Sequence, residues 1–170
     1  ILPALILVTL FIHASAIYNI ILSFLNVILV KPAPLTFVGF QNYQDVLSDP
    51  VFLTALTNSG FFIVVGTLLA MISGLAIGVL LSLEYKFNGV LRAVILLPWI
   101  LPDVVVASEW KWMLQSEMGV VNFILEDLGL IYGKIAWLGS ETFSLPSCTF
   151  VIAWRLCPFV ALMVAATIYG

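Results

Sequence analysis

Charged residues are scarce in this sequence of 170 residues. Asp, Glu, Lys and Arg together make up 9% of the chain, whereas hydrophobic residues make up 63%. A soluble domain carries about 25% charged residues, so this composition excludes an ordinary soluble fold and indicates an integral membrane protein. The six Lys and Arg residues are scattered and the formal net charge is −3, which argues against a nucleic-acid partner.

Cysteine and histidine are nearly absent as well. The chain has two cysteines, Cys148 and Cys157, and one histidine, His13. These residues do not form the ligand clusters of a zinc site, so we expect no metal and no other cofactor bound by this chain. The two cysteines would lie about 13 Å apart along one helix, too far for a disulfide, and we expect both to be buried thiols. No Ser/His constellation and no His-Glu-x-x-His motif appears, so we expect a protein that is not an enzyme.

Long apolar runs occupy most of the chain. They are uninterrupted and suit the length of about 20 residues that a membrane helix needs, which favours helices over the alternating strands of a barrel. We predict an all-α integral membrane protein. Its four transmembrane helices would lie at about 2–27, 57–83, 93–113 and 146–169.

The polar segments between these spans predict the orientation in the membrane. The link 84–92 carries two basic residues in nine positions, whereas the longer segments 31–55 and 115–145 carry one each. The positive-inside rule then places the link in the cytoplasm and both longer segments outside, each with a short amphipathic helix on the membrane surface. The N-terminus and Gly170 would both be cytoplasmic.

The third span, 93–113, contains features that are unusual for a membrane helix. Pro98 and Pro102 each remove a backbone donor, and Asp103 and Glu109 place two acids within the apolar run. In lipid, such breaks persist only where protein or a water-filled cavity satisfies the freed carbonyls. We interpret this span as part of a solute pathway. The alternative is a kinked structural helix whose acids lie near the membrane surface.

A buried charge in the fourth span suggests a partner for these acids. Arg155 lies about 15 Å from the outer side, and Asp103 about 16 Å from the inner side. In a core of about 30 Å these depths coincide, so we predict an ion pair between them or a shared wet cavity. Glu109 is the alternative partner, and separate snorkelling of each residue is the other alternative. Pro158 predicts a further helix break in the fourth span.

A stripe of small residues runs along the second span. Ala70, Gly74 and Gly78 repeat at four-residue spacing, which places them on one face of a helix. Such a stripe lets another helix approach closely, so we expect it to be a helix-packing surface.

Several short motifs rich in aromatic residues, glycine and proline are spread along the chain. They are Phe37-Val-Gly-Phe-Gln-Asn-Tyr43, Leu47-Ser-Asp-Pro-Val-Phe52, Ala55-Leu-Thr-Asn58, Arg92, Leu97-Pro-Trp-Ile-Leu-Pro102, Trp110-Lys-Trp112, Gly119-Val-Val-Asn122, Trp137-Leu-Gly139, Trp154-Arg155 and Pro158-Phe159. In order and spacing, the chain resembles the permease subunits of sugar-type ABC importers, the group that includes maltose-type and glycerol-phosphate-type permeases.

The resemblance implies a transporter of several subunits in the inner membrane of a prokaryote. Each permease would have about six helices and would pair with a second permease. Two cytoplasmic ATPases would hold ATP and Mg²⁺, and an extracytoplasmic solute-binding protein would dock on the outer segments. In that family a Glu-Ala-Ala coupling loop follows the fourth span, so we expect the chain to be the N-terminal part of one transmembrane domain, truncated before that loop.

The resemblance also implies a carbohydrate substrate and an alternating-access mechanism. Sugar sites combine aromatic faces with polar groups that bind hydroxyls. The candidate pathway residues are Trp99, Trp154, Asn58, Asp103, Glu109 and Arg155. The alternative for each tryptophan is packing or anchoring at the membrane surface.

Two other classes of function fit parts of the sequence. A secondary transporter would use Asp103 and Glu109 for proton coupling, and its transport would collapse with the proton gradient. A truncated, non-transporting membrane scaffold would co-purify with neither an ATPase nor a binding protein.

Overall fold

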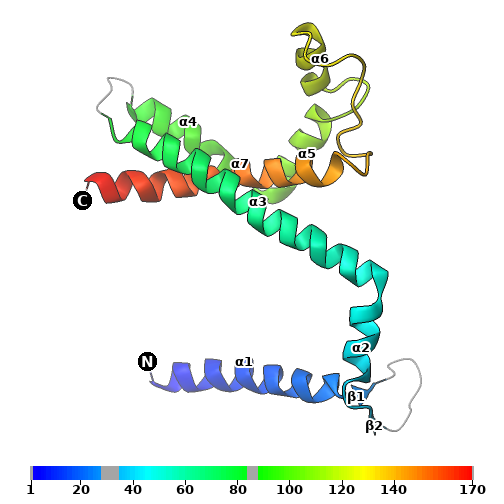
Figure 1. Ribbon diagram of the computed structural model, residues 1–170. Helices are drawn as coiled ribbons and strands as arrows, with labels where there is room; N and C mark the ends of the chain where they lie inside the picture. Colours follow the sequence, from blue (N-terminus) through cyan, green and yellow to red (C-terminus); the bar gives the residue numbers. More distant parts are fainter. Residues whose placement is uncertain (1, 28–34, 84–87, 170) are drawn as a thin grey trace. The chain divides into compact units, whose positions relative to one another are not determined.

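The computed structural model describes residues 2–27, 35–83 and 88–169, which form two compact units (Figure 1). The units are Ile1–Thr57 and Asn58–Gly170. Lys31, Lys86 and Gly170, which entered the prediction of orientation, lie outside the described residues.

The first unit joins a long apolar helix to a short amphipathic one. Its elements are α1 (Leu2–Ser23), β1 (Leu25–Asn26), β2 (Thr36–Phe37), α2 (Gln41–Ser48) and the beginning of α3 (Pro50–Leu81). The two strands pair antiparallel with Leu25 opposite Phe37. The described residues are therefore helical apart from this two-residue ladder, which is a small departure from the all-α prediction.

In the second unit, the described residues form the remainder of α3 and four further helices. They are α4 (Asn88–Ile100), α5 (Asp103–Met113), α6 (Val120–Asp127) and α7 (Ser144–Tyr169). Figure 1 shows α3, α4 and α7 side by side, and α5 leading away from them toward α6. The core of this group is formed by residues from all three helices: Ile77, Leu81, Leu91, Ile95, Ala161 and Ala165.

The small-residue stripe of α3 packs against α7. Ala70, Gly74 and Gly78 are all buried. A Cβ added at Gly74 would lie 2.5 Å from Cβ of Val160, and one added at Gly78 would lie 2.6 Å from Cβ of Val164. Such distances leave no room for a side chain, so glycine sets how closely the two helices approach. The opposing face of α7 is also built of small residues that are buried, namely Thr149, Ala153, Cys157, Ala161 and Ala165.

Among the residues that the structure describes, two helices are long and apolar enough to cross a membrane, namely α3 and the segment Ser144–Ile168 of α7. The helices α4 and α5 meet this condition only as a pair, bent by 96° at the break between them. The segment Leu7–Ser23 of α1 is a shorter apolar helix. The protein is thus a multi-pass membrane protein with two or three candidate spans, and the number four stays a prediction.

Helix boundaries in the first unit differ from those predicted from hydropathy. Helix α1 ends at Ser23, earlier than the predicted 27, because the chain turns into β1. Helix α3 begins at Pro50, inside the segment predicted to be an external loop. Asp49 explains this start, since its carboxylate accepts a hydrogen bond from the Val51 N–H at 2.8 Å and caps the helix, while proline suits the first helical position.

The predicted cytoplasmic link also proves shorter than expected. Helix α4 begins at Asn88, so residues 88–92 of the link 84–92 are helical. The side-chain amide of Asn88 donates to the carbonyls of Leu81 and Leu83, both at 2.9 Å. This contact ties the end of α3 to the beginning of α4.

The cysteine prediction was correct for one residue only. Both thiols are free, and Cys157 is buried against α3 as expected. Cys148 is exposed, because it lies on the outer side of α7 between the buried residues Ser147 and Thr149.

Candidate functional site at the broken span

The break in the third span lies at residues 101–102. Pro98 lies inside α4, whereas Pro102 separates α4 from α5 as the N-terminal cap of α5. Pro102 has no N–H to donate to the carbonyl four residues earlier, so the helix hydrogen-bond ladder is interrupted there. The backbone turns by 96° at this point. A break was predicted from the prolines, and the structure attributes it to the second one. Pro158, by contrast, is accommodated inside α7.

Arg155 of α7 contacts both sides of this break. Its guanidinium forms an ion pair with the carboxylate of Asp103, the first residue of α5. Its Nη2 also donates to the carbonyl of Leu101, the residue just before Pro102, at 3.4 Å. The ion pair predicted from the depths of the two residues is therefore present. The alternative partner, Glu109, is not the one that Arg155 contacts, since Asp103 is the first residue of α5 and lies beside the break.

The two partners of this ion pair differ in exposure. The Arg155 side chain is 28% exposed, and that of Asp103 is 77% exposed. The Nε atom of Arg155 is buried and has no hydrogen-bond partner among the described residues. The site thus presents an accessible carboxylate held in place by a mostly covered cation.

Aromatic contacts hold α7 against both arms of the broken span. Trp99 of α4 lies 5.8 Å from Phe159, and Trp110 of α5 lies 5.3 Å from Trp154, measured between ring centroids. Trp110 also packs edge-on against Phe150 at 5.6 Å. Trp99 and Trp154, which were candidates for sugar stacking, are therefore engaged in packing, although 46% of Trp99 remains exposed.

Two further candidate residues lie apart from this cluster. Asn58 is exposed on α3 and lines a cavity of about 360 Å³ with Ser59, Phe62, Ile63 and Leu145. Glu109 is exposed on α5. Within the described residues, neither forms a hydrogen bond or ion pair with Asp103 or Arg155. The pathway role of all six candidates stays a prediction.

Sequence inspection missed a polar residue that organises the segment after α5. Asn122 is only 3% exposed. Its side-chain amide donates to the carbonyls of Ser116 and Ile135, both at 2.9 Å, and its oxygen accepts from Nε1 of Trp137 at 2.8 Å. The motif Gly119-Val-Val-Asn122 thus anchors Trp137-Leu-Gly139. The only sequence signal was the asparagine itself, flanked by apolar residues.

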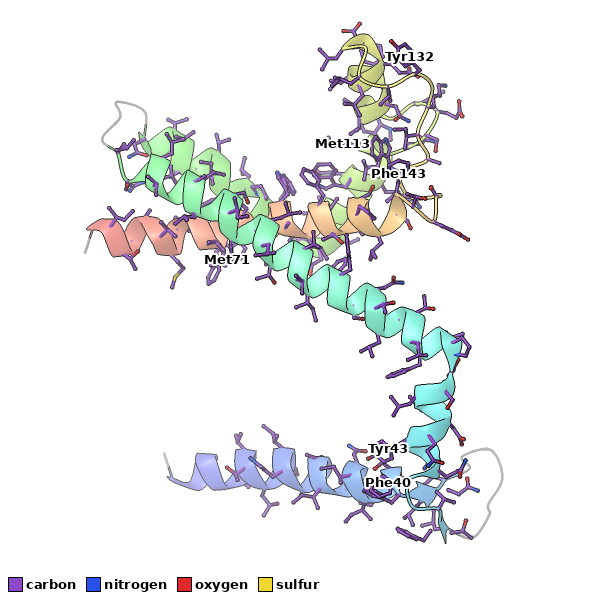
Figure 2. All side chains as sticks on the ribbon, viewed as in Figure 1. Phe40, Tyr43, Met71, Met113, Tyr132 and Phe143 are labelled. Atoms are coloured by element: carbon purple, nitrogen blue, oxygen red, sulfur yellow. The ribbon has the colours of Figure 1, made fainter. Side chains whose placement is uncertain are left out.

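Asn42 has a similar role in the first unit. Its amide donates to the carbonyls of Ser23 and Leu25, at 2.8 and 3.0 Å, and so satisfies acceptors at the end of α1. Figure 2 shows Phe40 and Tyr43 together at this end of α1, and their rings lie 5.9 Å apart. The motif Phe37–Tyr43 therefore joins α1 to α2.

The segment between α5 and α7 also contains a surface ion pair. Nζ of Lys134 lies 2.7 Å from a carboxylate oxygen of Glu117. The hydrogen bond to Glu117, followed by the attraction of its negative charge, raises the pKa of Lys134 above its ordinary value of 10.5. Among the described residues, no group of three His, Cys, Asp or Glu side chains is placed to hold a metal ion.

Comparison with known proteins gives one consistent result. No protein-family model matches the chain. A probable ABC transporter permease protein of Pyrococcus horikoshii is 29% identical over 98% of the chain and 56% of its own length. The sulfoquinovosyl glycerol transport system permease protein of Agrobacterium fabrum is 30% identical over 96% of the chain and 53% of its own length. The trehalose/maltose transport system permease protein of Thermococcus litoralis is 33% identical over 76% of the chain and 43% of its own length.

A solved structure shares the fold. A crystal structure of a bacterial ABC transporter involved in the import of the acidic polysaccharide alginate matches with a TM-score of 0.76, at 19% identity, over 97% of this chain and 54% of that one. The chain spans about half the length of the curated relatives it matches. These relatives are transport subunits and not enzymes. The chain belongs to the family of ABC transporter permeases to which the sugar-transport permeases belong.

Proposed function

We propose that the chain is part of a permease subunit of an ATP-driven, binding-protein-dependent carbohydrate importer, in which it forms part of the translocation pathway. The observation that carries this proposal is the similarity to named sugar-transport permeases over 96% of the chain in one case and 76% in another. The broken, acid-bearing span adds a physical reason, because interrupted helices with ionisable residues mark solute pathways in membranes.

The whole transporter would contain four kinds of partner for this chain. They are a second permease, a cytoplasmic ATPase dimer that holds ATP and Mg²⁺, an extracytoplasmic solute-binding protein, and the sugar. Link 84–92 and both chain ends would face the cytoplasm, and α2 and α6 would lie on the outer membrane surface. Transport would proceed by alternating access, with ATP binding shifting the permeases toward an outward-open state.

Polar side chains along the broken span would bind sugar hydroxyls. Asp103 and Glu109 are the exposed acceptors on α5, and Asn58 is exposed on α3. The exposed part of Trp99 would offer an aromatic face.

The test is extraction of the native protein from its membrane, followed by intact-mass measurement and identification of the co-purifying subunits. We expect an ATPase subunit and a second permease. The purified assembly in liposomes should then take up radiolabelled maltose, trehalose or diacetylchitobiose when ATP and the binding protein are supplied. Uptake that follows a proton gradient and ignores ATP would contradict the proposal, as would a complex without an ATPase.

A further inference from the structure

The break between α4 and α5 leaves two backbone problems that the span cannot solve alone. Pro102 cannot donate a hydrogen bond, and the Leu101 carbonyl lies outside both helices. An unpaired carbonyl at membrane depth is strongly unfavourable, because no water is present there to satisfy it. Whatever binds that carbonyl therefore also fixes the geometry of the bend.

One guanidinium meets this need from another helix. Nη2 of Arg155 donates to the Leu101 carbonyl, and Nη1 contacts the Asp103 carboxylate. The two acceptors lie on either side of Pro102. Arginine is suited to this task because its donors are held in a rigid planar fork, whereas a lysine ammonium is a single point charge.

Aromatic contacts near Arg155 pack α7 against both arms of the bent span. Phe159, one turn after Arg155, packs on Trp99 of the α4 arm. Trp154, adjacent to Arg155, packs on Trp110 of the α5 arm. Arg155 thus lies between two contacts that reach opposite arms, so that a shift of α7 would move both arms together.

We propose that Arg155 is a positioning residue that clasps the two sides of the break and couples the bend of the third span to the position of α7. The coupling to transport rests on the proposed function, whereas the clasp itself does not. Asp103 is the clasp partner, and its exposed carboxylate remains accessible from the side away from Arg155. Glu109, exposed on the same helix, has no part in the clasp.

The bend can be measured without sugar or ATP. Spin labels are placed at Val90 on α4 and Ala107 on α5, both exposed, in full-length permease whose native cysteines are replaced. Pulsed electron paramagnetic resonance should give one narrow distribution of distances between the two labels. Arg155→Gln and Asp103→Asn should broaden it, and the matched control Glu109→Gln should leave it unchanged. Distance distributions of equal width in the wild type and all three variants would overturn the proposal.

Two further variants cover the case in which Arg155→Gln fails to fold. Arg155→Lys keeps the charge but loses the fork, so we expect an intermediate width. The exchange Asp103→Arg with Arg155→Asp should restore part of the narrow distribution, which simple loss of packing would not do. An Arg155→Lys distribution as narrow as that of the wild type would show that the charge alone suffices, and the clasp would be wrong.

Transport kinetics separate the clasp from sugar binding. In proteoliposomes we expect Arg155→Gln to lower the maximal uptake rate by about fivefold or more, as couplings between contacting residues commonly do. The sugar concentration at half-maximal rate should stay unchanged. Asp103→Asn with Arg155→Gln should be no slower than either single change. If Arg155→Gln changes the sugar concentration at half-maximal rate but not the distance distribution between the labels, Arg155 binds sugar and the clasp is wrong. Absence of ATP-driven uptake in the wild type would refute the proposed function alone.

Discussion

At the scale of single residues, three asparagine side chains hold together backbone segments that lie outside the apolar helix contacts. Asn42, Asn88 and Asn122 each donate their amide to two backbone carbonyls. The carbonyls bound by Asn42 and Asn88 lie at or beyond helix ends, where the helix itself supplies no donor. A short amide can approach two such acceptors with little loss of side-chain entropy, because asparagine has few rotatable bonds.

The importance of Asn122 can be tested by truncation. Asn122→Ala would leave Trp137 Nε1 and the Ser116 and Ile135 carbonyls without their partner. Each buried group left unpaired costs about 1–3 kcal/mol, so we expect residues 115–143 to lose their fixed conformation. The fluorine resonance of 5-fluorotryptophan at position 137 should broaden or shift. Asn42→Ala, a similar change in the other unit, should leave this resonance unchanged, and an identical response to both changes would contradict the role of Asn122.

The ion pair of Lys134 predicts a dependence on alkaline pH. Because its pKa is raised in the folded state, the pair stabilises the segment at pH values below the ordinary pKa of 10.5. This contribution is lost as the pH rises through the raised pKa, when the ammonium group deprotonates. The fluorine resonance of residue 137 should therefore change above about pH 10.5 in the wild type. That step should be absent in Lys134→Met and retained in Lys111→Met.

At the scale of helices, the close contact of α3 with α7 depends on residues without side chains. Gly74→Ala would place a Cβ 2.5 Å from Val160 Cβ and 3.0 Å from the Cys157 carbonyl. Overpacking of this kind costs about 1–3 kcal/mol, so we expect a lower melting temperature in detergent. Gly60→Ala, on the same helix with open space around it, should not lower the melting temperature. Equal effects of the two substitutions would show that α3 does not pack on α7 through this face.

The two prolines of the third span should behave differently. Pro102→Ala restores an N–H that can donate to the carbonyl of residue 98, so we expect a straighter span and a longer distance between labels at 90 and 107. Pro98→Ala should leave the bend in place, because Pro98 already lies within α4. A straightened span in Pro98→Ala would contradict this assignment, because it would show that Pro98 causes the bend.

The same helices show what sequence reasoning reached and where it failed. The Asp103–Arg155 pair was predictable from the constant rise of a helix per residue, taken together with the predicted entry of the two spans from opposite sides. The choice between Pro98 and Pro102 was not, since each removes one donor and Arg155, distant in sequence, binds beside the second. The start of α3 was predictable from Asp49-Pro50, a capping residue followed by a proline. The prediction instead followed hydropathy, which placed the start at about residue 57. For Asn122 the only signal was an asparagine among apolar residues, and its partners could not be predicted because they lie in an irregular segment.

At the scale of the whole molecule, the orientation in the membrane connects every proposed role. The positive-inside rule places the link 84–92 in the cytoplasm and the segment 115–145 outside, and labelling of single cysteines tests this orientation directly. Tyr132 is fully exposed in the segment proposed to lie outside, as its side chain shows at the tip of the second unit (Figure 2). Gly89, near the start of α4, is exposed and has open space around it in the link proposed to be cytoplasmic.

Single cysteines at these two positions give opposite expectations. In full-length protein with Cys148→Ser and Cys157→Ala, a membrane-impermeant maleimide added to intact spheroplasts should label Tyr132→Cys and leave Gly89→Cys unlabelled. After the membrane is permeabilised, both should react. The reverse labelling pattern would show that the orientation in the membrane is opposite to the predicted one. The segment containing α6 would then face the ATPases instead of the binding protein, and Arg155 would approach the break from the cytoplasmic side. The clasp would survive that inversion, because it depends on contacts between helices, whereas the proposed docking of a binding protein on 31–55 and 115–145 would not.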